Sequence, residues 1–441
     1  MQHNRRLWEI KRFLPMGLAV VLLAAAVTLC SVLGPGMALQ TEEEIEPDSS
    51  QSVTPHQEEE PATSGPGAEG VALEGEMRAV WVPFMSLNMQ GTDYSEEAFR
   101  EKFDAIIAGA KQAGANTLVV HVRPFGDALY PSSSFPWSHL VTGEQGKDPG
   151  YDPLAYMVEA THQAGMQFHA WVNPLRIQIS GSPQQLSAEN PYQQWRGDSE
   201  QENDLWVLDY GEDKYYNPAV PQVRELIING VKEIVENYAV DAIHFDDYFY
   251  PTTDSTFDSA SYNEYCAQLG EGETPLAQSD WRTANINALI SGVYGAVHSA
   301  QAKNAQVQFG ISPQGNTGNC LAMGADVYAW GSVAGYVDYL CPQIYVNFDH
   351  PLLPFDQMAQ EWKSLVTNEK VKLYLGLALY KAGSDVDEGT WQLSDDIIRR
   401  EVEYGRQMGC DGFMLYSYDY LDNEQTKKEM ENLLTIWGQT S

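Results

Sequence analysis

Short apolar strands alternate with amphipathic helices from residue 76 to the end of the chain. Eight runs have the composition of buried strands, and the stretches between them carry apolar residues at helical spacing, such as Phe99, Phe103 and Ile106. This alternation predicts parallel strands joined by crossover helices, because parallel neighbours need a long connection. The predicted strands are Met77–Val82, Thr117–Val122, Met166–Val172, Asp241–Asp247, Val307–Ser312, Val337–Tyr345, Val371–Ala378 and Asp411–Ser417.

Eight such units predict an α/β protein with a (β/α)8 TIM barrel over residues 76–441. A minimal barrel needs roughly 250 residues, so we expect long insertions after the third and fourth strands, in the connections 173–240 and 248–306. A doubly wound open sheet is the alternative, but no glycine-rich phosphate loop follows any predicted strand. The clearest predicted helices are Glu96–Ala113, Leu154–Ala164, Val220–Tyr238, Trp281–Ala302 and Ser394–Met408.

The N-terminal part of the chain has a different composition. Basic residues precede an uncharged apolar run that extends from Phe13 to Ala38, which is typical of a signal peptide or a membrane anchor over residues 1–38. Residues 39–75 are rich in Glu, Pro and Ser, and they nearly lack large apolar side chains. That composition predicts a disordered acidic linker. We therefore expect an extracellular or cell-surface protein that contacts a membrane only through residues 1–38, if these are not cleaved.

The formal net charge is −35. A surface this acidic repels nucleic acid, so we expect no nucleic-acid partner. His121, His169 and His244 lie on different strands, and a single strand histidine is more often structural than a metal ligand. No metal and no cofactor is predicted, and the sequence leaves the oligomeric state open. It also assigns no disulfide to the four cysteines of the body, which lack metal-site spacing: Cys266, Cys320, Cys341 and Cys410.

The fourth strand ends in two adjacent carboxylates, Asp246 and Asp247. Buried acids are costly unless a partner compensates them, so a buried strand that delivers two of them indicates a site. Both side chains can face the same cleft only if the strand ends between them, because neighbours on a strand point to opposite faces. A structural alternative has one Asp catalytic and the other capping a helix or pairing with Arg123 or Arg176.

Aromatic and polar residues also follow the other strands, at the end of a barrel where catalytic groups collect. Trp and Tyr offer flat apolar faces to sugar rings, while amides, Arg and Asp can bond to hydroxyl and N-acetyl groups. This inventory predicts a polysaccharide ligand. The candidate substrate-binding residues are Trp81, Arg123, Asp127, Trp171, Asn173, Arg176, His244, Tyr248, Gln314, Asn316, Gln343, Tyr345, Asn347, Tyr380, Tyr416 and Tyr418.

Asp246 and Asp247 are the candidate catalytic residues. Glycoside hydrolysis uses one carboxylic acid to protonate the leaving oxygen and a second carboxylate at the anomeric carbon. Repulsion between neighbouring carboxylates can keep one of them protonated near neutral pH. The pair also suits a substrate-assisted mechanism, in which the N-acetyl oxygen of the sugar attacks. Tyr345, with Asn347 or Gln343, would then hold the acetyl group.

Several longer motifs resemble the glycosyl hydrolase-like 10 family over about residues 76–438. They include MRAVWVP from Met77, FHAWVNPLR from Phe168, DAIHFDDYFYP from Asp241, GISPQGN from Gly310 and DGFMLYSYDYL from Asp411. The resemblance implies a TIM barrel, a bacterial cell-surface protein and glycan cleavage. One suggested substrate is peptidoglycan strands that lack stem peptides.

The resemblance also implies functional positions at Asp246 and Asp247, with Arg123, Asp127, Asn173 and Arg176 as substrate contacts. The fourth-strand motif is similar to the chitinase pattern Asp-x-x-Asp-x-Asp-x-Glu, but His244 replaces one Asp and Tyr248 stands where the acid Glu would be. The resemblance to the chitinase pattern therefore does not extend to its acid residue. Two alternatives to a cell-wall hydrolase stay open: a non-catalytic glycan-binding barrel, and a hydrolase of another extracellular polysaccharide.

Overall fold

The structure, a computed structural model, describes residues 70–73, 75–299 and 301–437. The expected signal or anchor segment, residues 1–38, lies outside the described residues, as does most of the expected linker. Among the helices that the structure describes, none is both long and apolar enough to cross a bilayer. Within residues 70–73, the Val71 N–H donates to the Asp241 carboxylate at 2.8 Å, and Gln167 donates to the Val71 carbonyl at 2.7 Å.

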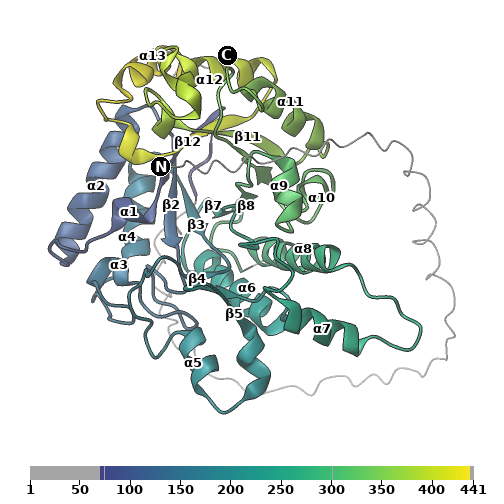
Figure 1. The fold of residues 1–441 in the computed structure, drawn as a ribbon. Coiled ribbons are helices and arrows are strands. Elements are labelled where there is room, and N and C mark those ends of the chain that lie inside the picture. The colour runs from purple at the N-terminus through teal and green to yellow at the C-terminus, as the bar shows by residue number, and fades with distance from the viewer. Residues whose placement is uncertain (1–69, 74, 300, 438–441) are drawn as a thin grey trace, which may run out of the picture. The chain divides into compact units, whose positions relative to one another are not determined.

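Eight parallel strands close into a barrel with helices between them, which confirms the predicted fold (Figure 1). The ring closes where β12 pairs with β1, and the order around it follows the chain. The barrel strands are β1 (Met77–Val82), β2 (Thr117–Arg123), β3 (Gln167–Val172), β7 (Ala242–Phe245), β8 (Gln308–Ile311), β9 (Tyr339–Leu340) with β10 (Gln343–Ile344), β11 (Lys372–Leu377) and β12 (Gly412–Leu415).

The sixth barrel strand is interrupted, whereas the sequence predicted one continuous strand from Val337 to Tyr345. β9 and β10 are separated by Cys341 and Pro342, since proline has no N–H to donate to a neighbouring strand. The Pro342 carbonyl instead accepts from the Gly376 N–H at 2.9 Å. The backbones of Pro342 and residue 376 approach so closely that residue 376 must be glycine, because a Cβ there would lie 2.9 Å from the Pro342 carbonyl oxygen.

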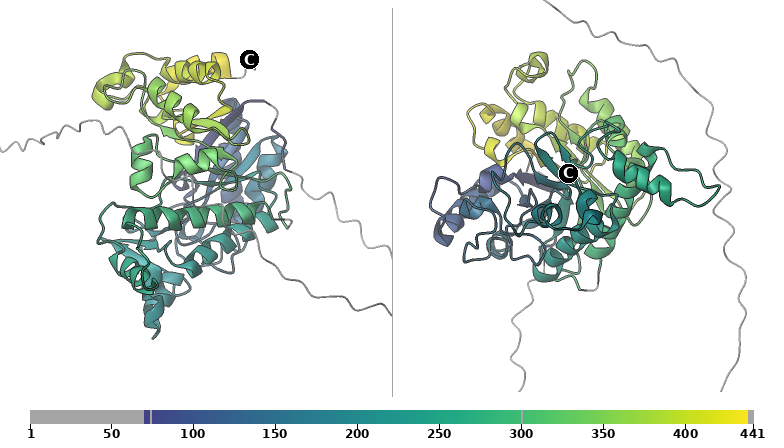
Figure 2. Two further views of the ribbon diagram at one scale, coloured as in Figure 1. Left: turned by 90° about the vertical axis from the view of Figure 1, so that its right-hand side faces the viewer. Right: turned by 60° about the horizontal axis from the view of Figure 1, so that its bottom comes forward.

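Helices surround the barrel in all three views (Figures 1 and 2). Their apolar faces pack on the outward side chains of the strands; α2, for example, buries Phe99 and Phe103. The helix predicted at Trp281–Ala302 instead begins at Gln278 and ends at Val297. The earlier start places Asp280 in the first turn, where an acidic side chain interacts favourably with the helix dipole. The helices are α1 (Phe84–Leu87), α2 (Glu96–Gln112), α3 (His139–Thr142), α4 (Pro153–Gln163), α5 (Pro191–Gly197), α6 (Pro221–Asn237), α7 (Ser259–Gln268), α8 (Gln278–Val297), α9 (Thr317–Ala322), α10 (Val327–Ser332), α11 (Phe355–Leu365), α12 (Ile397–Gln407) and α13 (Lys427–Trp437).

The two predicted insertions are present. The connection from β3 to β7 contains α5 and a small antiparallel sheet in the order β4-β6-β5, which the sequence did not predict. The connection from β7 to β8 contains α7 and a loop that projects from the barrel at the right of Figure 1 before α8 begins. The strands of the small sheet are β4 (Arg176–Gln178), β5 (Val207–Tyr210) and β6 (Asp213–Tyr216).

Inward and outward side chains of the barrel strands form two separate cores. In β1, Val80 and Val82 belong to the outer core beneath the helices, while Ala79 and Trp81 belong to the inner one. The inner core fills the barrel, so the barrel is packed and is not a pore. Its upper layer, at the carboxyl ends of the strands, contains Trp81 and Trp171 and becomes the floor of a cavity.

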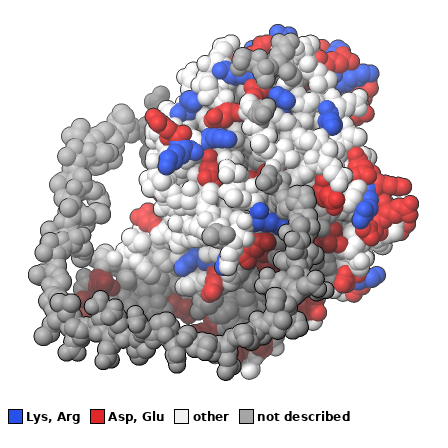
Figure 3. Space-filling model, turned by 180° about the vertical axis from the view of Figure 1, so that it is seen from behind, with Lys and Arg blue, Asp and Glu red and all other residues white. Residues whose placement is uncertain are grey.

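The described part of the face shown in Figure 3 carries basic side chains that are scattered among acidic ones. Broad basic patches are what polyanions bind, and this part of the surface does not present one.

Candidate active site

The candidate site begins where β7 ends. The strand stops at Phe245, and Asp246 and Asp247 follow it directly. Because the regular strand is over before the pair, both carboxyl groups line one cavity. That cavity, about 470 Å³ in volume, lies at the carboxyl ends of the barrel strands. Its lining consists of Trp81, Pro83, Phe84, Met85, His121, Trp171, Arg176, Asp246, Asp247, Tyr248, Ser312, Gln343, Tyr345, Tyr380 and Tyr416.

Asp246 is buried and held by several donors. The Trp171 indole N–H donates to Oδ2 at 3.1 Å, the Asn173 amide donates to both oxygens at 3.1 Å, and the Tyr248 N–H donates to Oδ1 at 3.3 Å. Burial raises the pKa of Asp246, while the charge of Arg176 and these hydrogen bonds oppose the rise. Donors that bond to a carboxylate stabilise its charged form.

Asp247 has a different environment. Its carboxylate accepts one side-chain hydrogen bond, from Gln343 at 3.1 Å. Burial, followed by the charge of Asp246, raises the pKa of Asp247 to about 6. If the two groups share one proton, it therefore resides on Asp247, because protonating Asp246 would sacrifice more hydrogen bonds. The pair can thus present one acid and one carboxylate near neutral pH.

A chain of hydrogen bonds runs beneath the cavity floor. Trp81 donates from its indole N–H to Nε2 of His244 at 3.2 Å, and Nδ1 of His244 lies 2.9 Å from the Tyr339 hydroxyl. That hydroxyl is also 3.1 Å from Nδ1 of His169. Burial holds the pKa of His244 well below its usual value, so the ring is neutral and can accept from Trp81. His244 therefore supports the floor from below.

Three buried polar groups of the lining have no hydrogen-bond partner among the described residues. They are both ring nitrogens of His121, Nε of Arg176 and the hydroxyl of Ser312. His121 also stacks face to face on Trp171, with the ring centroids 3.6 Å apart. Unpaired buried polar groups are unfavourable, and in the wall of a cavity they are available to bond to a polar ligand or to water. The lining is thus prepared for a ligand that carries hydrogen-bonding groups.

One wall of the cavity is aromatic. The rings of Tyr345, Tyr380 and Tyr416 lie 5.7 to 5.8 Å apart, centroid to centroid, and Tyr416 is 6.0 Å from Trp81. Tyr248, which follows Asp247 in the chain, also lines the cavity and is half exposed, and the Arg176 guanidinium lies 4.0 Å over its ring. Flat apolar walls next to polar groups are typical of sugar sites.

Several predicted site residues lie outside this cavity. Arg123 is buried with its guanidinium 4.1 Å over Phe135, and Asp127 accepts from Gln145 and lies 3.0 Å from His139. The others have structural contacts: Asn173 holds Asp246, Asn316 caps α9, Gln314 bridges to Gln343, Asn347 donates to Thr390, and Tyr418 packs on α2 next to Gly109.

The lining also contains residues that the sequence did not single out as site residues: Pro83, Phe84, Met85, His121 and Ser312. Each lies at or just after the end of β1, β2 or β8, so position at a strand end was the available signal. The sequence did not show whether each of these side chains points into the cavity, because the residue pattern of a single strand does not give that direction.

Within the described ranges, no group of three or more His, Cys, Asp or Glu side chains is arranged to hold a metal ion. His169 and His244 meet at Tyr339, whereas His121 lies on Trp171. The four described cysteines are free thiols.

Comparison with known proteins places the chain in a family. Glycosyl hydrolase DigH of Escherichia coli strain K12 is 30% identical over 448 residues, which cover 95% of this chain and 96% of DigH. Glycosyl hydrolase YngK of Bacillus subtilis strain 168 is 34% identical over 359 residues. That match covers 76% of this chain but 66% of YngK, so the chain spans just under two thirds of that relative.

Solved structures share the fold at low sequence identity. The PgaB (BpsB) glycoside hydrolase domain of Bordetella bronchiseptica has a TM-score of 0.53 and 14% identity, covering 81% of this chain and 99% of that one. The catalytic domain of a β-amylase from Paenibacillus polymyxa has a TM-score of 0.52 and 12% identity, covering 82% and 99%. These two likenesses show the fold alone. The family model Glycosyl hydrolase-like 10 matches residues 76–392, and the chain belongs to that family.

Proposed function

We propose that the protein hydrolyses a glycosidic bond in an N-acetylhexosamine-containing cell-wall glycan, such as peptidoglycan strands that lack stem peptides. The observation that carries the proposal is the pair Asp246 and Asp247, whose carboxyl groups line one aromatic cavity but have different hydrogen-bond environments. Membership of the family and the names of DigH and YngK as glycosyl hydrolases support a carbohydrate substrate.

Asp247 is the proposed general acid. Its raised pKa keeps a proton available near pH 6, and transfer of that proton to the glycosidic oxygen lets the leaving sugar depart as an alcohol. Asp246, fixed by Trp171 and Asn173, stays a carboxylate and stabilises the positive charge that develops at the anomeric carbon.

The neighbouring N-acetyl group can supply the nucleophile. Its carbonyl oxygen would bond to the anomeric carbon as the old C–O bond breaks, and water would later open the ring so formed. Of the two amides that the sequence offered for holding the acetyl group beside Tyr345, only Gln343 lines the cavity. Asn347 is buried and donates to Thr390 instead. Gln343 is therefore the proposed partner.

We also propose export, because basic residues precede the apolar run from Phe13 to Ala38. The acidic segment 39–75 would hold the barrel away from a membrane. Fractionation of cells that express the full chain tests this: the protein should appear outside the cytoplasm, and retention in the cytoplasm would contradict it.

Mass spectrometry of products from a substrate panel tests the proposed reaction. The panel contains denuded peptidoglycan, chitin oligosaccharides, fully deacetylated chitosan and α- and β-glucans. We expect new reducing ends from the N-acetylated chains. Equal cleavage of chitosan would exclude the acetyl group as nucleophile, and cleavage of glucans alone would replace the proposed substrate by another polysaccharide.

A further inference from the structure

Aromatic rings continue beyond the mouth of the cavity, along one face of the small β4-β6-β5 sheet. Tyr248 at the mouth contacts the Arg176 guanidinium, and Arg176 pairs in register with Tyr215 of β6. The Phe257 ring packs against Tyr215 with 6.2 Å between centroids. The rings of the cavity mouth and of the insertion are thus linked by one cation–ring contact, one cross-strand pair and one ring–ring contact.

The row ends at Tyr210, the last residue of β5. Its ring centroid lies 5.9 Å from that of Phe257, and the residue is 46% exposed. Leu208 pairs opposite Tyr215, and side chains two positions apart share a face of a strand, so Tyr210 lies on the same face of the sheet as Tyr215. We refer to Tyr248, Tyr215, Phe257 and Tyr210 as the aromatic strip.

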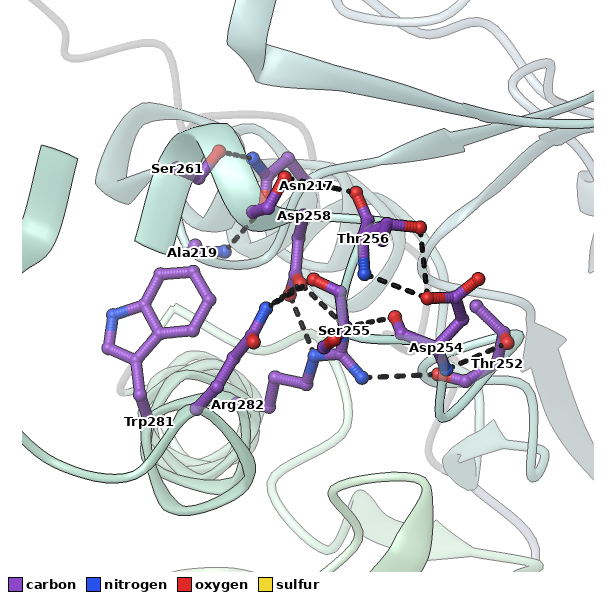
Figure 4. A network of polar contacts seen from close by, with 12 residues as sticks. Asn217, Ala219, Thr252, Asp254, Ser255, Thr256, Asp258, Ser261, Trp281 and Arg282 are labelled. Atoms are coloured by element: carbon purple, nitrogen blue, oxygen red, sulfur yellow. Dashed lines mark hydrogen bonds and ion pairs between the residues drawn. The ribbon is translucent and has the colours of Figure 1, made fainter. Parts of the chain in front are cut away.

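A buried arginine fixes the loop that carries two members of the strip (Figure 4). Arg282 of α8 forms an ion pair with Asp258, and its guanidinium donates to the carbonyls of Thr252 at 3.3 Å and Asp254 at 2.8 Å. Tyr248 and Phe257 stand at the two ends of this loop. Their rings are therefore presented on a rigid support, which lowers the entropy cost of binding.

Acidic side chains accompany the exposed end of the strip. Asp213 pairs directly opposite Tyr210 in the β5–β6 hairpin, and Glu212 lies in the turn between the two strands. Their carboxylates can accept hydrogen bonds from hydroxyl groups. Tyr248 and Tyr210 are the exposed rings of the strip, Phe257 is partly buried, and Tyr215 is buried beneath them. Exposed apolar rings with a polar rim are typical of ligand-binding surfaces, and Tyr248 also lines the cavity.

We infer that the aromatic strip binds additional sugar rings of the same glycan chain whose scissile bond lies in the cavity. Continuity at Tyr248 identifies the occupant as the substrate chain itself. This inference rests on the proposed function and extends it: the protein acts within long chains, and its efficiency rises with chain length until the chain reaches Tyr210.

Matched substitutions of exposed tyrosines test the strip. Tyr210→Ala removes the ring at its far end, Tyr210→Phe keeps the ring, and Tyr328→Ala on α10 is the control, because Tyr328 is also 46% exposed. We measure kcat/KM on long denuded strands and on a short chitin oligosaccharide. Tyr210→Ala should lower kcat/KM on long strands about five- to tenfold and leave the short substrate unchanged. The other two variants should behave like wild type.

Binding separates failure of this inference from failure of the proposed function. In the Asp247→Asn background, Tyr210→Ala should weaken affinity for long strands about five- to tenfold, as in kinetics. If wild type cleaves both substrates and Tyr210→Ala changes neither reaction, the aromatic strip does not bind the chain, while the proposed hydrolase activity is supported. If wild type cleaves neither substrate but binds long strands through Tyr210, the proposed hydrolase activity is wrong, while glycan binding by the aromatic strip is supported.

Discussion

At the scale of single residues, the two catalytic candidates differ in their partners more than in their position. Asp246 receives hydrogen bonds from Trp171, Asn173 and the Tyr248 backbone, whereas Asp247 receives one from the Gln343 side chain. The sequence predicted the pair, but not this asymmetry, because the donors come from β3 and β10 and from a loop.

The asymmetry predicts the pH dependence of catalysis. An acid must be protonated to act, so kcat/KM should fall as pH rises through the pKa of Asp247, about 6. Asp246→Asn removes the charge that contributes to this raised pKa, so the remaining activity should fall at a lower pH than in wild type. A pH–rate profile of both proteins measures this. An unchanged midpoint in the variant would show that another group is the acid.

Substitution of His121 by Phe should raise stability but lower activity. His121→Phe keeps the stack on Trp171 but removes ring nitrogens that have no partner among the described residues. We expect stability to rise by about 1 kcal/mol and kcat/KM to fall roughly tenfold, because the ligand loses a hydrogen bond. Urea unfolding and steady-state kinetics check both. His169→Phe is the control: it breaks the hydrogen bond to Tyr339 outside the cavity, so it should destabilise.

At the scale of elements, α12 and α13 meet at a buried pair of acids. Glu429 accepts from the backbone N–H groups of Ile397 and Ile398, while neither oxygen of Glu401 has a partner among the described residues. Burial raises the pKa of Glu401 well above its usual value and that of Glu429 to about 7. Burial is the larger cause for both groups.

A raised folded-state pKa means that the folded protein binds more protons than the unfolded chain between the two pKa values. The stability that Glu429 contributes is therefore present at pH 4 and lost as pH rises from about 4.5 to 7. Glu401→Gln replaces the carboxyl by a neutral amide, so it should stabilise the protein by about 1–3 kcal/mol at pH 8 and by much less at pH 5. Denaturant unfolding at both pH values tests this, and equal effects would contradict it.

The α7–α8 insertion depends on Arg282. Arg282→Gln leaves Asp258 as a buried charge without its ion-pair partner, which typically costs about 3–5 kcal/mol. Thermal unfolding should show the loss. Arg399→Gln is the matched control, because Arg399 pairs with Glu403 on an exposed helix face, where a pair contributes little. Equal losses in the two variants would show that the buried network does not hold the loop.

At the scale of the whole molecule, the barrel was predictable because each buried parallel strand is an apolar run of its own, as in Thr117–Arg123. The break in the sixth strand at Pro342 was not predictable, since it depends on the neighbouring strand. The antiparallel β4-β6-β5 sheet was not predictable either, because its strands are short and polar. Strand-end position found Asp246, Trp171 and Tyr345 in the cavity, but it could not separate them from Asn316 and Asn347, which have structural contacts.

Turnover by wild type, Asp246→Asn and Asp247→Asn on denuded peptidoglycan, measured together with binding of the same strands, tests the central claim most directly. Wild type should release soluble glycan fragments. Both variants should lose at least about 100-fold of this activity, yet still bind the strands. Cleavage that survives in both variants, or binding by wild type without any release of fragments, would contradict the account.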